Sequence, residues 1–152
     1  MSERNTSDLK LIAFDEEDLA IIAAHLQDAV VRVEDMAFLK KEQRFAMVVN
    51  RFDWNHAAQA VAKPGRFVRR RAGVRFEHVK AAQVSSVDLA SKDAVLSLLT
   101  VTFEPWDAPQ GAVLLTFAGG GRVRLEVECI ETALTDLGAA WETRRKPEHA
   151  SD

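Results

Sequence analysis

The clearest pattern of apolar and polar positions lies between residues 112 and 141. Residues 122–129 alternate between charged and apolar side chains, the period of a strand with one face in water and one in a core. The apolar run 112–117 supplies a partner strand. The three glycines at 119–121 between them suit a tight turn, because glycine accepts positive φ angles. The pattern therefore predicts a β-hairpin.

After Cys129 the period changes. Ile130, Leu134, Leu137 and Trp141 recur at i, i+4, i+7 and i+11, which is one stripe of an amphipathic helix. A helix that follows a hairpin directly is expected to fold back over the apolar face of the sheet. Cys129 faces the core by the alternation of the strand, which favours a buried thiol over a nucleophile.

A strand and a helix are expected near the N-terminus. The apolar run 9–14 indicates a short strand, and Asp15 suits the N-cap of a helix whose first turn is acidic, as the helix dipole favours. His25 lies beside the apolar stripe, where we expect a rim histidine and not a catalytic one. The stripe itself is formed by Leu19, Ile22, Ala23 and Leu26.

The middle of the chain predicts further antiparallel strands. Residues 29–38, with a bulge or bend at 35–36, are expected to form a hairpin with residues 44–52 through a charged turn at 40–43. Strands are also expected over 67–87, with a break at 72–73, and over 95–103, with a loop over 105–111.

Together these elements predict an α+β, mainly β fold. About seven antiparallel strands in meander order, closed by a C-terminal helix, follow an extra N-terminal strand and helix. This order is that of a partly open pleckstrin-homology-like barrel or a curved sheet. We expect a single domain over residues 1–152, with flexible tails at 1–8 and 143–152.

Net charge, cysteine content and the absence of long apolar runs indicate where the protein is expected to reside. The 152 residues carry a net charge of −3 and one cysteine, so a generic polyanion binder is not expected and no internal disulfide can form. The polar N-terminus lacks the apolar region of a signal peptide, and no apolar run is long enough to span a membrane. We expect a cytoplasmic protein without a membrane span.

One segment is strongly basic. Between residues 63 and 80 there are seven lysines and arginines and a single acid, Glu77. Guanidinium groups bind phosphate and carboxylate in a bidentate manner, so this segment is a candidate binding site. The pattern favours the simpler alternative, a solvated strand face and loop whose arginines pair with surface acids. Nucleic acid is the least favoured ligand. The candidate binding residues are Arg66, Arg69, Arg70, Arg71 and Arg75.

Asp53 and His56 are the candidates for acid–base chemistry, because they stand three residues apart in an irregular segment. Asp53 could instead cap a helical turn, with His56 at the surface. His78 alternates with Val74 and Phe76, which favours a partly buried, hydrogen-bonded histidine. The histidines and the cysteine show no metal-ligand spacing. The glycine turn at 119–121 joins two strands and is not a phosphate loop. Neither a metal nor a cofactor is expected.

Several short segments spread over nearly the whole chain match a known family. They are residues 9–13, 18–19, 24–29, 44–45, 50–54, 75–77, 98–99 and 115–121, continuing to Trp141. On these segments the chain resembles the bacterial Domain of Unknown Function 2948 family of alphaproteobacteria. That resemblance implies no activity, cofactor or site.

These patterns are compatible with three functions. The first is a non-catalytic interaction or scaffold module that binds a protein partner or itself, in the latter case as a homodimer, through a strand edge, residues 53–64 or the basic segment. The second is a binder of a phosphate-bearing ligand or nucleic acid through Arg66–Arg75. The third is a small enzyme that uses Asp53 and His56.

Overall fold

The computed structural model describes residues 8–53 and 67–143. These residues form ten strands and one α-helix. In chain order they are β1 (Lys10–Ala13), α1 (Glu16–Leu26), β2 (Val30–Arg32), a 3₁₀ turn (Val33–Asp35), β3 (Met36–Leu39), β4 (Arg44–Phe52), β5 (Phe67–Phe76), β6 (Val79–Ser85), β7 (Val95–Asp107), β8 (Gln110–Phe117), β9 (Arg122–Val127) and β10 (Thr132–Thr143).

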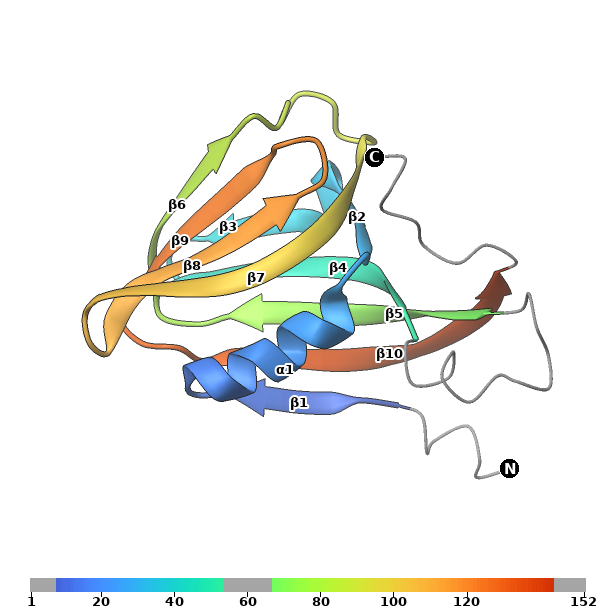
Figure 1. Ribbon diagram of the computed structural model, residues 1–152. Coiled ribbons are helices and arrows are strands. Elements are labelled where there is room, and N and C mark those ends of the chain that lie inside the picture. The colour runs from blue at the N-terminus through green and yellow to red at the C-terminus, as the bar shows by residue number, and fades with distance from the viewer. Residues whose placement is uncertain (1–7, 54–66, 144–152) are drawn as a thin grey trace.

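The ten strands form one antiparallel sheet that is not closed. The strand order is β1-β10-β5-β4-β2-β7-β8-β9-β6, and β3 pairs with β4 beside β2. Figure 1 shows the sheet folded into two layers, with β1, β10, β5 and β4 in one and β7, β8, β9 and β6 in the other. Helix α1 lies across the open side and contacts β7, β1 and β4. The core fills the space between the layers.

The N-terminal strand and helix are confirmed. Asp15 caps α1 by accepting a hydrogen bond at Oδ1 from the backbone N–H of Asp18 over 2.8 Å, and the first turn is acidic. The buried residues of the helix are Leu19, Ile22 and Leu26. The stripe at helical spacing is thus the face that covers the sheet.

The hairpin at residues 112–129 is also confirmed, as β8 and β9. Gly119 and Gly120 have φ values of 89° and 99°, so the turn uses the left-handed conformations that glycine tolerates. Val123, Leu125 and Val127 are buried, as the alternation requires. Cys129 lies just beyond β9 and is half-buried, which differs from the expected core position.

A bend near residue 35 lets one stretch of chain join both layers. The 3₁₀ turn separates β2 from β3 at the place where the alternation slips. β2 pairs with β7 through three residue pairs and with β4 only through Val30 and Asn50. β3 pairs with β4 alone within residues 8–53 and 67–143. β2 therefore leaves β4 and crosses to the other layer.

The predicted C-terminal helix is wrong. Residues 132–143 form strand β10, which pairs with β5 on one side and β1 on the other. Thr132 and Leu134 are buried at 1% and 0% exposure, whereas Leu137 of the supposed helical stripe is 50% exposed. Pairing with β5 over residues 132–136 and 140–143 satisfies backbone groups along both stretches and overrides the local helical period.

The predicted topology is corrected as well. β10 lies between β5 and β1, and β6 pairs with β9, so the strands do not follow a meander. The pleckstrin-homology-like order, with its closing helix, is not seen. The break expected at 72–73 falls instead at residues 77–78, and the expected loop at 105–111 is only a turn between β7 and β8.

No helix within the described ranges has the length and apolar character that crossing a membrane requires. Most of the two segments predicted to be tails lies outside these ranges.

Two glycines test the packing of the sheet. A Cβ on Gly111 would lie 2.5 Å from the backbone oxygen of Glu104 and 2.5 Å from Cζ of Phe103, whereas one on Gly73 would meet only the Leu137 side chain, at 3.8 Å. Gly111→Ala should therefore lower the free energy of unfolding by about 1–3 kcal/mol, and Gly73→Ala should change it by less than about 1 kcal/mol. Urea denaturation measures both, and equal effects would contradict the packing described.

Candidate functional site

The inner face of β4 and β5 changes from apolar to charged toward one end. Along β4, Val49 faces the core, and the next inward residue is Arg51, which is 1% exposed. Arg51 stands opposite Arg70 of β5 in the strand register. Asp53, directly after β4, is 2% exposed. Two guanidinium groups are thus carried into the interior, where each needs an anionic partner.

Arg51 is paired with Asp136 of β10. Its Nε donates to Oδ1 over 2.9 Å and its Nη2 to Oδ2 over 2.8 Å. Both side chains are 1% exposed. The backbone N–H of Leu9 donates to Asp136 Oδ2 over 2.9 Å. This carboxylate therefore joins β4, β10 and the residue before β1.

Asp53 is paired with Arg70. Arg70 Nε donates to Asp53 Oδ2 over 2.8 Å, and its Nη1 donates to Asp8 Oδ1 over 3.3 Å. Asp53, which the sequence offered as a candidate for acid–base chemistry, is thus the buried partner of an arginine in an ion pair. His56 lies outside the described residues, so its proposed pairing with Asp53 stays a prediction.

His25 of α1 lies near this charged cluster. Burial lowers the pKa of His25 from its ordinary value of 6.5, and the positive charge of Arg51 lowers it further, while Asp53 and Asp136 act in the opposite direction. The neutral imidazole is therefore the form that the fold favours.

The outward arginines of β5 do not form one continuous patch. Arg69 donates through Nη1 to the carbonyl oxygens of Asn50 and Asp28 over 3.2 and 3.4 Å, and its guanidinium carbon lies 5.9 Å from the ring centroid of Phe52. Burial lowers the pKa of Arg69, and Asp28 partly offsets this effect. Arg70 faces inward, Arg71 is exposed, and Arg66 lies outside the described residues.

Arg75 shares an acid with a residue of the neighbouring strand. Arg75 Nη1 lies 3.0 Å from Glu77 Oε2, and Arg44 Nε lies 2.9 Å from the same oxygen. His78, the other candidate, sits in the turn after β5 with φ 59°. Its Nε2 lies 2.8 Å from Glu131 Oε1, so it is a hydrogen-bonded, partly exposed histidine.

An apolar groove crosses the outer face of β3, β4, β5 and β10. It has a volume of about 490 Å³. Its ends carry Arg44, Arg75 and Glu34. Leu39 and Leu137 in its lining are 39% and 50% exposed. The remaining lining is mostly small or apolar and includes Ala37, Ala46, Val48, Gly73 and Ala133. We call this surface the outer groove.

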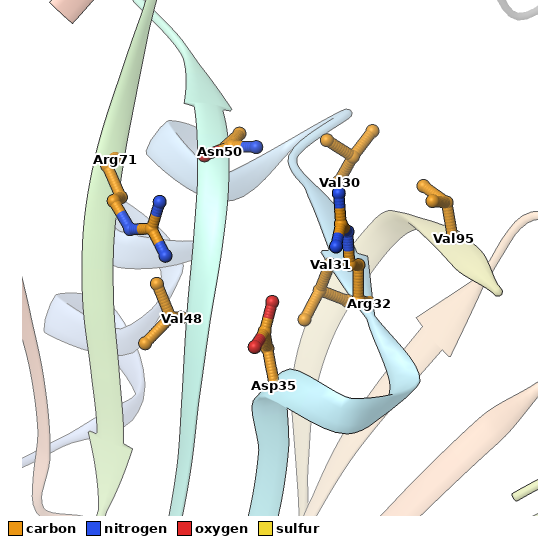
Figure 2. A pocket seen from close by; sticks show the side chains of 8 residues that line it. All are labelled: Val30, Val31, Arg32, Asp35, Val48, Asn50, Arg71 and Val95. Atoms are coloured by element: carbon orange, nitrogen blue, oxygen red, sulfur yellow. The ribbon is translucent and has the colours of Figure 1, made fainter. Parts of the chain in front are cut away.

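A second, polar hollow lies where β2 leaves β4. Its volume is about 330 Å³. Figure 2 shows the side chains of Arg71, Asn50, Asp35 and Arg32 around it, with the Asp35 carboxylate between the two arginines. Val30, Val31, Val48 and Val95 complete the lining. We call this hollow the polar pocket. Asp35 and Val48 line both surfaces.

Sequence reasoning found neither surface. Both depend on β4 and β5 lying side by side, and the outer groove also needs β10 as a strand. One signal was present: the outward positions 46 and 73 are Ala and Gly, where a face exposed to water normally carries polar residues.

Among the described residues, no group of three histidine, cysteine, aspartate or glutamate side chains could hold a metal ion. A family model described as "Protein of unknown function (DUF2948)" matches residues 9–149. Neither a curated protein nor a solved structure matches the chain.

The lowered pKa of His25 has a consequence for stability. The unfolded chain, with a histidine pKa near 6.5, takes up the proton more readily than the folded protein. His25 should therefore add stability that is present above about pH 6.5 and is lost as the pH falls below it. Unfolding free energies measured between about pH 5 and pH 7 should fall less steeply in His25→Gln than in the wild type. Identical dependence of the unfolding free energy on pH in the two proteins would contradict the lowered pKa of His25.

Proposed function

The chain belongs to the DUF2948 family, and we propose that it is a non-catalytic interaction module that docks another protein in the outer groove. The observation that carries the proposal is the apolar lining of this solvent-facing surface. An antiparallel sheet with one wet face usually carries polar residues there. An exposed apolar surface rimmed by charge is typical of a docking site.

The shape of the groove suits side chains of a partner. Gly73 lies in its floor, and Leu137 lies over that glycine, with its Cδ2 atom 3.8 Å from the point where a Cβ would stand. The half-exposed leucines leave apolar surface that a partner would remove from water, at roughly 25 cal/mol per Å².

The charges at one end indicate which partner fits. Arg44 and Arg75 share the single carboxylate of Glu77, so these three side chains together carry one net positive charge. The two arginine side chains are 39% and 48% exposed, so they remain accessible. We propose that the occupant is an apolar segment of a different protein with an acidic residue beside it, which those guanidinium groups would bind.

A charge placed in the groove tests this proposal. Ala46→Lys puts an ammonium group into the apolar lining of β4, and Gln83→Lys places the same group on exposed β6 as a matched control. Affinity capture from the native cell should retain the same partner with the wild type and with Gln83→Lys, and should lose it with Ala46→Lys. Urea denaturation checks that both variants fold.

Retention of that partner by folded Ala46→Lys would overturn the groove as the docking site. Light scattering tests the alternative occupant, a second copy of this chain. A wild-type dimer that Ala46→Lys converts to a monomer would assign the groove to self-association and contradict a foreign partner.

A further inference from the structure

The polar pocket differs in chemistry from the outer groove. Arg71 reaches it from β5, Asn50 from β4, and Arg32 and Asp35 from β2 and the turn that follows (Figure 2). It forms because β2 pairs with β4 at one residue pair only and then turns toward β7. The opening is therefore part of how the two layers are joined.

Two charges of opposite sign in this pocket have no partner in the part of the chain that the structure describes. No hydrogen bond or ion pair links the side chains of Arg71 and Asp35 to any residue within 8–53 or 67–143. Arg32, by contrast, is 3.5 Å from Glu34. Asp35 is half-buried, and its carboxylate accepts no hydrogen bond from those residues, so it is available to a ligand.

We propose that the polar pocket binds a small zwitterion, of which a free aliphatic amino acid is the simplest example. The ligand carboxylate would pair with the Arg71 guanidinium, with the Asn50 amide as a further donor. The ligand ammonium would pair with Asp35. The side chain would lie against Val30 and Val48. A volume of about 330 Å³ is at the small end of ligand sites and suits a molecule of this size.

The position of Asp35 argues against phosphate. Its carboxylate lines the same pocket as Arg71 and Arg32 (Figure 2), so a dianion bound there would be repelled by a negative charge of the lining. A ligand that carries its own positive group turns that repulsion into an attraction. This proposal does not depend on a protein partner in the outer groove.

Three related probes test the charge pairing. L-leucine carries both charges, N-acetyl-L-leucine lacks the ammonium, and L-leucinamide lacks the carboxylate. Titration of the ¹⁵N-labelled protein should shift the amide signals of Val31, Asn50 and Arg71 with L-leucine, with a dissociation constant of about 1 mM or tighter. Each of the other two probes should bind at least about tenfold more weakly.

The variants assign each charge to a residue. Arg71→Gln should weaken L-leucine about tenfold and remove the preference over L-leucinamide. Asp35→Asn should remove the preference over N-acetyl-L-leucine. Arg122→Gln is the matched control, because Arg122 is an exposed arginine of β9 that lines neither surface, and it should bind as the wild type does.

The proposal is overturned if L-leucine shifts none of these signals, or if inorganic phosphate binds more tightly than L-leucine. It is also overturned if Arg71→Gln and Arg122→Gln bind L-leucine equally well.

Discussion

The ion pair between Arg51 and Asp136 is the constraint on which the rest of this structure depends. Both side chains are 1% exposed and share two hydrogen bonds. Transfer of two charges out of water costs several kcal/mol each, so neither is tolerated inside without the other. Nη1 of Arg51 is buried without a partner among the described residues, so Asp136 is the acid on which the buried charge of Arg51 depends. β4, β10 and the segment before β1 must therefore assemble together.

This constraint also shapes the outer surface. Past Asp136 the register of β10 against β5 shifts before Ala140, and Gly138 there has a φ of 87°. Leu137 follows the inward Asp136 and therefore faces outward by the alternation of the strand, over Gly73. The same short stretch thus holds a buried carboxylate inside and an apolar side chain outside. Fixing Asp136 in the interior fixes one wall of the outer groove.

The sequence predicts what local chemistry decides. Asp15 as N-cap, the glycine turn and the alternation of β9 all follow from neighbours along the chain. β10 could not be predicted in this way, because its pairing with β5 and the Arg51–Asp136 pair join residues far apart in sequence. One hint existed: Arg51 follows Phe45, Met47 and Val49 on the inward face, and a buried arginine requires a distant acid. The family description names no site. The outer groove and the polar pocket become visible only once the strands that line them are placed side by side.

Neutralising Asp136 without changing its shape tests the central constraint most directly. Asp136→Asn should lower the free energy of unfolding by about 3–5 kcal/mol, because it leaves Arg51 charged and buried. Glu126→Gln breaks an arginine–carboxylate pair whose side chains are 35% and 36% exposed, and it should cost at most about 1 kcal/mol. Urea denaturation of both variants measures the difference, and a loss for Asp136→Asn no greater than that for Glu126→Gln would contradict the account.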